Sequence, residues 1–282
     1  MKLATFSDDA APRAGLVVED GIVDIGAHLL GRPMAMIELI DTWDSNAANV
    51  DALSRIPADV SLAKARLHAP VPRPGKIMGI GLNYADHAAE AELELPSYQM
   101  WFSKAVTSIT GPFDPIILPK VSDKLDYEAE LVFIVGKRCR HVSRDEARSA
   151  IFGFCVGNDV TVRDWQFRTS QFTLGKSFDT HAPFGPWITT ADAIDPHALG
   201  IRCLVNGEQR QNSRTSHFIF DCYDQLAYLS QAMTLEPGDA FFTGTPAGVG
   251  AAMTPPQFLQ DGDVVRVAID GLGEIESVVR AE

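Results

Sequence analysis

The fold of this 282-residue chain is decided by one stretch, DYEAELVFIVG at residues 126–136. Nearly every residue from Ala129 to Val135 is apolar, which is typical of a strand buried on both faces. Glu128 and Glu130 stand at its N-terminal end and, being two positions apart, point to the same face. Two carboxylates at a cavity wall repel each other, and a hard cation such as Mg²⁺, Mn²⁺ or Ca²⁺ removes that repulsion. The alternative is a strand that starts at the surface with two solvated glutamates.

Other strand-like runs surround this stretch, and turn signals rich in Gly, Asp, Asn and Pro separate them. They occupy residues 76–80, 152–156, 201–205, 240–243 and 264–269. Helical periodicity is confined to a few segments, chiefly 143–151, where Ser143 and Glu146 have the spacing of a capping box, and 222–233. A regular alternation of strand and helix is missing, which argues against a doubly wound sheet or a TIM barrel. We therefore expect a β-rich α+β fold with peripheral helices.

The chain before residue 70 has its own pattern. The pair Asp20-Gly21 separates two apolar runs and predicts a hairpin turn, and a helical stretch is expected near residues 34–51. Prolines at positions 70, 72 and 74 interrupt any regular element. We therefore predict a small N-terminal domain at residues 1–69 and a catalytic domain at residues 70–282.

Composition limits the classes of function. With 46% hydrophobic residues the chain is globular, and 24 Lys and Arg against 37 Asp and Glu give a formal charge of −13. No basic run is present, so nucleic-acid binding is not expected. A run of about 18 apolar residues and an export leader are also missing, which predicts a cytoplasmic protein without a membrane partner. The four cysteines are spaced too irregularly for a zinc site, and we interpret them as structural.

A second apolar run, residues 152–158, also ends in an acid, Asp159. Asp159 is therefore a candidate third oxygen ligand beside Glu128 and Glu130. Its alternative role is to cap a helix that starts near Thr161, because Asp is a favoured N-cap residue.

The segment IGLNYADHAAE at residues 80–90 places His87 and Glu90 three positions apart, on one face if the segment is helical. That spacing lets the carboxylate fix the imidazole tautomer, so that the pair can act as a base toward water. An exposed His–Glu pair on a surface helix is the commoner occurrence.

Two more segments supply candidates, LGKSFDT at residues 174–180 and TGTPAGVG at residues 243–250. The first resembles a fragment of a phosphate loop, but the required preceding glycine and the strand-to-helix context are absent, so we exclude a nucleotide site. Lys176 is either a cation for an acidic substrate or a solvated surface lysine. The second segment has small residues whose backbone can approach a ligand closely, or it is a plain glycine-rich turn.

Taken in order, these segments together with GNDVTVRDWQ at residues 157–166 resemble the motifs of the fumarylacetoacetate hydrolase family. The resemblance covers roughly residues 70–282, and the leading region is similar to the small N-terminal domain that many members carry. It implies a mixed β-sandwich or β-roll core and a homodimer. It also implies one Mg²⁺ or Mn²⁺ per subunit, held by Glu128, Glu130 and Asp159.

The resemblance also implies an activity on small 2-oxo acids, especially acylpyruvates, of the kind met in aromatic or sugar acid catabolism. The metal would chelate the 1-carboxylate and the 2-oxo oxygen and stabilise the enolate left when the C3–C4 bond breaks. A water activated by His87 with Glu90 would attack C4, and Lys176 would stabilise the developing oxyanion. The implied substrate-binding residues are Arg163, Gln166, Lys176 and Thr245.

The His–Glu pair favours a C–C hydrolase that releases pyruvate, because hydrolysis needs a base aimed at water. Family membership alone leaves two enzyme alternatives, an oxaloacetate-type decarboxylase and a dienedioate isomerase. A protein that binds metal and 2-oxo acid without turnover is a further alternative. The segment from Glu92 to Ser103, which is rich in aromatic residues, is expected to form a lid or pocket wall near the site.

Overall fold

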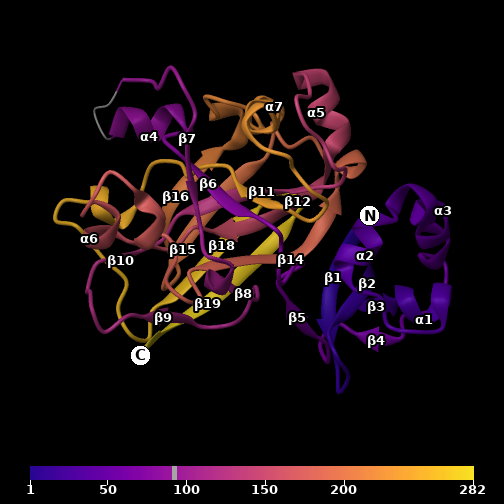
Figure 1. The fold of residues 1–282 in the computed structure, drawn as a ribbon. Helices are drawn as coiled ribbons and strands as arrows, with labels where there is room; N and C mark the ends of the chain where they lie inside the picture. The colour runs from indigo at the N-terminus through magenta and orange to yellow at the C-terminus, as the bar shows by residue number, and fades with distance from the viewer. Residues whose placement is uncertain (91–93) are drawn as a thin grey trace.

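Two β-sheets pack face to face in the computed structural model, which describes residues 1–90 and 94–282 (Figure 1). The large sheet runs in the spatial order β4 (Val60–Ser61), β3 (Gly21–Asp24), β2 (Arg13–Val18), β1 (Lys2–Ser7), β14 (Ala182–Thr190), β12 (Ile151–Asn158), β11 (Ala129–Val135), β17 (Ala240–Phe242), β6 (Ile77–Gly81) and β7 (Met100–Ser103). Two short strands join it at the side: β5 (Arg66–His68) on β1 and β8 (Ile109–Thr110) on β14.

The smaller sheet has the order β16 (Glu208–Arg214), β15 (Gly200–Val205), β18 (Val264–Ile269), β19 (Gly273–Ala281) and β9 (Ile116–Leu118). A separate pair is formed by β10 (Leu125–Asp126) and β13 (Thr161–Val162). The helices are α1 (Ile25–Leu30), α2 (Met36–Asp41), α3 (Trp43–Leu53), α4 (Ala85–Glu90), α5 (Arg144–Ala150), α6 (Arg163–Gln166) and α7 (Cys222–Ala232). None of the described helices is long and apolar enough to cross a membrane.

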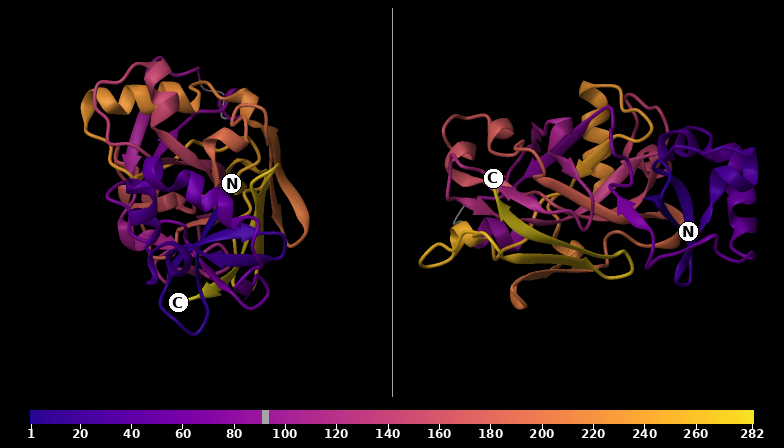
Figure 2. Two further views of the ribbon diagram at one scale, coloured as in Figure 1. Left: turned by 90° about the vertical axis from the view of Figure 1, so that its right-hand side faces the viewer. Right: turned by 90° about the horizontal axis from the view of Figure 1, so that it is seen from below.

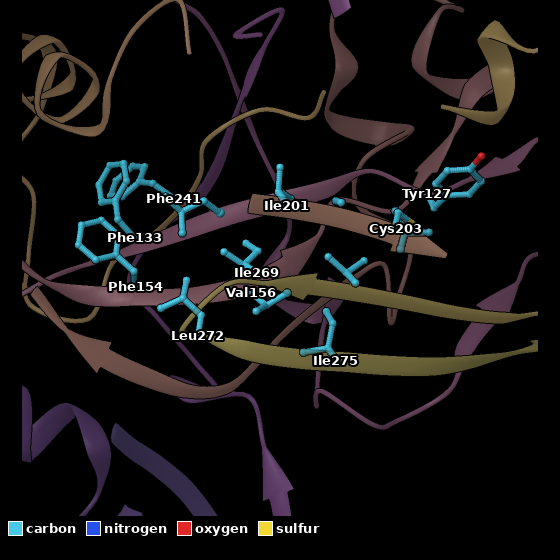
Figure 3. Packing of buried hydrophobic residues seen from close by; sticks show 14 of the residues in the cluster. Tyr127, Phe133, Phe154, Val156, Ile201, Cys203, Phe241, Ile269, Leu272 and Ile275 are labelled. Carbon is cyan, nitrogen blue, oxygen red and sulfur yellow. The ribbon is translucent and has the colours of Figure 1, made fainter. Parts of the chain in front are cut away.

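Strand β11 is buried on both faces, as its sequence predicts. On one face, Phe133 packs with Ile201 of β15 and Ile269 of β18 in the core between the two sheets (Figure 3). The Phe133 ring also stacks on Phe241, with 5.1 Å between ring centroids. On the opposite face Val132 belongs to a second apolar cluster, which extends into the N-terminal helices. The β-rich α+β class is confirmed.

The N-terminal region lies at one end of the molecule (Figure 2). Its strand β1 pairs with β14, with Leu3 opposite Ile188, so the large sheet continues from residues 1–69 into the rest of the chain. The expected hairpin is present as β2–β3, but its two loop residues are Glu19 and Asp20, because Val18 already pairs with Gly21. The division into two domains at residue 70 stays a prediction.

Most of the predicted elements are found with small shifts at their ends. The predicted helix near residues 34–51 is two helices, α2 and α3, which are separated at Thr42. Ser143 caps α5, and both hydrogen bonds of the capping box with Glu146 are formed. All four cysteines are free, in agreement with the structural interpretation.

Candidate active site

The three predicted acids lie together where β11 and β12 meet. Glu130 is the second residue of β11, Glu128 directly precedes that strand, and Asp159 directly follows β12. The antiparallel register pairs Ala129 with Asn158, which brings the three carboxylates to one edge of the strand pair. One oxygen of each lies within 4.8 Å of the others, and the residues are only 6%, 1% and 0% exposed in chain order.

Local backbone geometry excludes the alternative roles of these acids. The Asp159 amide donates to the Glu128 carbonyl at 2.9 Å, and the Glu128 amide donates to the Asn158 side chain at 2.9 Å. Asp159 caps no helix, because α6 begins four residues later and has Val162 at its N-cap position. Since all three carboxylates are buried, they are not solvated groups at the surface end of a strand.

Two cations neutralise part of the acidic cluster. Lys176 is 2% exposed and donates to Glu128 Oε2 and to Asp159 Oδ2, both at 2.8 Å. Arg163 donates to Glu128 Oε1 at 2.6 Å and to Asp126 Oδ2 at 2.8 Å. Lys176 is therefore a buried cation of the site, not a surface lysine.

The pKa values of the two glutamates move in opposite directions. Burial by itself raises the pKa of Glu128, but Lys176 and Arg163 outweigh burial and lower that pKa to about 2. Burial also raises the pKa of Glu130, and the negative charges of Asp159 and Glu128 raise it further, to well above its ordinary value. Glu130 is thus the acid of the cluster whose negative charge is least neutralised by nearby cations.

The donor set fits a divalent cation. Glu130 receives one hydrogen bond within the described residues, from the Gly244 amide at 2.7 Å. Its remaining lone pairs face two other carboxylates in a buried site, and carboxylate oxygens are the ligands that Mg²⁺ and Mn²⁺ prefer. These geometric facts support Glu128, Glu130 and Asp159 as the ligand set, without distinguishing the two metals.

Helix α4 brings His87 and Glu90 together as the spacing predicts. His87 Nδ1 lies 3.0 Å from Glu90 Oε2, and the two side chains are 20% and 23% exposed. The other Glu90 oxygen accepts a hydrogen bond from the Gly248 amide at 2.8 Å. Gly248 has a φ of 103°, a conformation that favours glycine, and a Cβ there would lie 2.1 Å from the Arg210 carbonyl oxygen. The glycine-rich segment therefore anchors the pair.

A cavity of about 370 Å³ joins the His–Glu pair to the acidic cluster. Glu128, Lys176 and Arg163 line it, and so do His87 and Glu90. The cavity is also lined by Gln166 and Thr245. A groove of about 510 Å³ elsewhere, beside Trp43 and Phe152, contains none of the predicted site residues.

The predicted substrate-binding residues have partners within the protein. Gln166 Oε1 accepts from Arg163 at 3.0 Å. The Thr245 hydroxyl donates to the Ala129 carbonyl at 2.9 Å and accepts from the Gln211 side chain at 2.8 Å. Thr245 thus ties the glycine-rich segment to β11 as well as lining the cavity.

Gly175 allows the segment that carries Lys176 to pack closely against helix α6. A Cβ on Gly175 would lie only 2.3 Å from the Gln166 amide nitrogen, so a larger residue would push this segment away from α6. The Gly175 carbonyl also accepts a hydrogen bond from the Val162 amide at 2.8 Å. The close packing of this segment holds Lys176 against the carboxylates.

Sequence reasoning missed two buried charged residues of the site. Lys104 is 4% exposed, donates to Asp159 Oδ1 at 2.5 Å and also donates to the Lys176 carbonyl. Burial lowers the pKa of Lys104, and Asp159 partly offsets this effect. Asp126 accepts hydrogen bonds from Arg163 and from the backbone amides of Tyr127, Gly250 and Ala251. The only sequence signal for Lys104 is a single lysine next to the apolar stretch MWF.

The predicted lid covers residues 92–103, of which 92 and 93 lie outside the described residues. Its C-terminal part is a strand of the large sheet rather than a loop, because β7 pairs with β6, with Phe102 opposite Gly79. Met100 and Phe102 line the cavity. The described part of this segment that lines the cavity is therefore a fixed wall.

Comparisons with known proteins agree on one family. The family model described as "Fumarylacetoacetate (FAA) hydrolase C-terminal" matches residues 76–280. A mitochondrial oxaloacetate tautomerase of Xenopus laevis is 42% identical, over 99% of this chain and 90% of its own length.

Two solved structures are similar over the whole chain. The maleylpyruvate hydrolase of Sphingobium sp. SYK-6, solved with manganese(II) and pyruvate, is 36% identical, with a TM-score of 0.85 and coverage of 100% of this chain and 99% of that chain. The 2-hydroxyhepta-2,4-diene-1,7-dioate isomerase of Mycobacterium marinum is 31% identical, with a TM-score of 0.76 and the same two coverages. The named relatives thus include a tautomerase, a hydrolase and an isomerase.

Proposed function

Because the chain belongs to the fumarylacetoacetate hydrolase family, we propose that it is a divalent-metal-dependent C–C hydrolase. Its substrate is a small 2,4-dioxo acid of the acylpyruvate type. Water adds at C4 and the C3–C4 bond breaks, which yields a carboxylic acid from the acyl side and pyruvate from the other side. The observation that carries this proposal is the His87–Glu90 pair on the wall of the cavity that Glu128 of the acidic cluster also lines.

The His–Glu pair is built to take a proton from water. Glu90 accepts from the Gly248 amide and is held in place by it. A carboxylate at His87 Nδ1 requires a proton on that nitrogen, which leaves Nε2 as the basic atom. His87 then accepts a proton from the attacking water through Nε2 and becomes an imidazolium beside Glu90. The same proton can return to C3 of the departing pyruvate carbanion.

The acidic cluster supports the other half of the reaction. Glu128, Glu130 and Asp159 would hold one Mg²⁺ or Mn²⁺, which supplies Lewis-acid stabilisation of negative charge on a bound 2-oxo acid. Lys176 keeps its proton: burial favours the neutral amine, but Asp159 and Glu128 outweigh burial and raise its pKa. Its ammonium group therefore stays charged beside the reacting oxygens.

Arg163 and Gln166 complete the substrate contacts in this proposal. Arg163 uses two of its nitrogens for Asp126, Glu128 and Gln166, and its third nitrogen, Nη2, has no partner among the described residues. Gln166 accepts from Arg163 with its oxygen, so its NH₂ group is the donor left for a substrate oxygen. Both side chains line the cavity.

Acetylpyruvate tests the proposal directly. We expect the protein with Mg²⁺ or Mn²⁺ to release one pyruvate and one acetate per acetylpyruvate, measured by coupling pyruvate to NADH oxidation with lactate dehydrogenase. A chelator should abolish the release. If no acylpyruvate yields pyruvate while the metal is bound, the hydrolase proposal is wrong.

A second candidate is tautomerisation of oxaloacetate, which the 42% identity with the Xenopus laevis enzyme favours. His87 can move a proton at C3 as well as it can accept one from water, and no C–C bond then breaks. Spectroscopic decay of enol-oxaloacetate, with no pyruvate formed, distinguishes this activity from hydrolysis and from decarboxylation. The remaining alternatives are an oxaloacetate-type decarboxylase activity, an isomerase activity on a dienedioate, and binding without turnover.

The proposal includes a homodimer in the cytoplasm. Light scattering coupled to gel filtration measures the oligomeric state, and a mass near twice 30.6 kDa is expected. Fractionation of the source cells tests the cytoplasmic location.

A further inference from the structure

The lining of the candidate active-site cavity combines two kinds of side chain. The charged set contains Glu128, Arg163 and Lys176. The apolar wall consists chiefly of Met100, Phe102, Phe167, Phe172 and Val249. Among the described residues that line the cavity, Arg163 is the only arginine and Lys176 the only lysine. The two sets therefore favour two different parts of one ligand.

The two cations of the charged set already have carboxylate partners. Lys176 contacts Glu128 and Asp159, and the Phe102 ring centroid lies 5.0 Å from its Nζ. Arg163 is held by Asp126 and Glu128, and its Nη2 is left to bind one terminal carboxylate of a 2-oxo acid. A second carboxylate meets no further lysine or arginine among the described residues that line the cavity.

Arginines near the cavity walls are also engaged elsewhere. Arg168 lies over the Trp165 ring, 4.0 Å from its centroid, and pairs with Asp164 at 3.3 Å. Arg210 pairs with Glu208 at 3.0 Å and donates to Gln257 at 2.7 Å. Neither arginine lines the cavity.

Three aromatic rings of the apolar wall lie side by side. The Phe172 ring lies 6.0 Å from the Phe102 ring and 5.9 Å from the Phe167 ring, measured between centroids. Phe167 is 67% exposed although it is a large apolar residue, so part of its surface is free for a ligand. Apolar groups gain by leaving water for such a wall, whereas a carboxylate gains no ionic partner there and loses the part of its hydration that the wall displaces.

We infer that the substrate is a monoacid: an acylpyruvate whose group beyond C4 is uncharged and apolar, either aliphatic or aromatic. This inference rests on the proposed function and names the substrate class of the same site. Oxaloacetate and maleylpyruvate, named for two relatives, are dicarboxylates and differ from this class. The apolar wall, and the lack of any lysine or arginine beyond Lys176 and Arg163 in the described lining of the cavity, carry the inference.

A turnover series measures the preference. We expect kcat/KM to rise about fourfold per added methylene from acetylpyruvate to hexanoylpyruvate, the gain for burying one CH₂ group. Benzoylpyruvate should also be cleaved well, and fumarylpyruvate at least tenfold less efficiently than benzoylpyruvate. A fumarylpyruvate rate equal to or above that of its neutral analogues overturns the inference and leaves the hydrolase proposal standing.

A binding experiment separates the inference from the proposed function, because it needs no turnover. Calorimetry with Mg²⁺ present compares 2-oxohexanoate with 2-oxoadipate, which have the same number of carbons and differ at the far end in a methyl or a carboxylate. We expect 2-oxohexanoate to bind at least tenfold more tightly. Equal or tighter binding of 2-oxoadipate overturns the inference, whatever reaction the enzyme catalyses.

A variant with a matched control tests the wall itself. Phe167→Arg adds a cation to the apolar wall, so the ratio of the two affinities should shift toward 2-oxoadipate by about tenfold. Phe113→Arg adds the same charge at a phenylalanine that is 53% exposed and does not line the cavity, and it should leave the ratio unchanged. An equal shift in both variants, or no shift in Phe167→Arg, contradicts the placement of the ligand's far end at this wall.

Discussion

Replacing Glu130 with glutamine should keep or raise the stability of the metal-free protein and should lower its affinity for the metal. Its carboxylate lies within 4.8 Å of carboxylate oxygens of Glu128 and Asp159. Two unit charges at that distance repel by about 3.5 kcal/mol at an effective dielectric constant of 20. The glutamine oxygen can still accept the hydrogen bond from Gly244. The metal-free variant should therefore be at least as stable as the parent, and at most about 3.5 kcal/mol more stable, the repulsion of one pair.

The same substitution should weaken metal binding severely. Removing a residue that only orients a metal ligand lowers the metal affinity by about 10–100-fold. Removing a ligand carboxylate should therefore lower the Mn²⁺ affinity by more than about 100-fold. Calorimetric titration with Mn²⁺ measures the affinity, and urea unfolding in the presence of a chelator measures the free energy of unfolding.

Asp126→Asn is the matched control, since it makes the same change from carboxylate to amide in a buried acid. Asp126 accepts from Arg163 and from three backbone amides, so an amide NH₂ there would face donors. We expect it to lose about 3–5 kcal/mol of stability, the cost of breaking a buried ion pair. If Glu130→Gln loses as much as this control in chelator, the repulsion argument is wrong. Unchanged Mn²⁺ affinity would remove Glu130 from the site.

Three further predictions concern single side chains. His87→Ala should lower acylpyruvate hydrolysis by about 10²–10⁴-fold with Mn²⁺ affinity retained, and an unchanged rate would refute its role as the base. Lys176→Met should lower kcat if Lys176 stabilises the transition state, whereas a rise in KM alone would show ground-state binding and changes below about twofold would show no chemical role. Burial lowers the pKa of His181 to about 3, so its neutral form is favoured in the folded state, and its contribution to stability is complete above pH 6.5 and lost as pH falls. The variant His181→Gln keeps a donor for the Ile117 carbonyl. Between pH 7.5 and 5 the free energy of unfolding of the parent should therefore fall by about 2 kcal/mol more than that of the variant. Equal falls, measured by urea unfolding, would contradict this prediction.

The strands with apolar runs could be predicted from the sequence, because burial on one or both faces leaves a periodic signal. Strand β18 is found at Val264–Ile269, at the predicted residues. Strand β14 was missed because Pro183 and Pro186 interrupt its sequence, and prolines usually exclude a central strand. Strand β16 was missed for another reason: it lies at the edge of the smaller sheet and has the polar sequence EQRQNSR.

The acids of the site could be predicted because they lie at the ends of apolar strands, where a buried charge is costly unless it has a partner. Lys104 gave no such signal, since its partner Asp159 lies 55 residues further along the chain and only the paired strands bring them together. The role of Asp126 as an acceptor of backbone amides depends on the loop at residues 250–251, which no local pattern connects with it. Long-range pairing is the information that a single sequence lacks.

The place of β17 between β11 and β6 has a consequence for the order of folding. Residues 240–242 pair with β11 on one side and with β6 on the other, so they join β6 and β7 to the rest of the large sheet. A ribosome that adds roughly 5–20 residues per second has made Lys176 several seconds before it reaches this strand. During that interval β11 has an open apolar edge, which is a target for chaperones and for aggregation. The acidic cluster is therefore synthesised early and enclosed late, when the C-terminal part of the chain inserts β17.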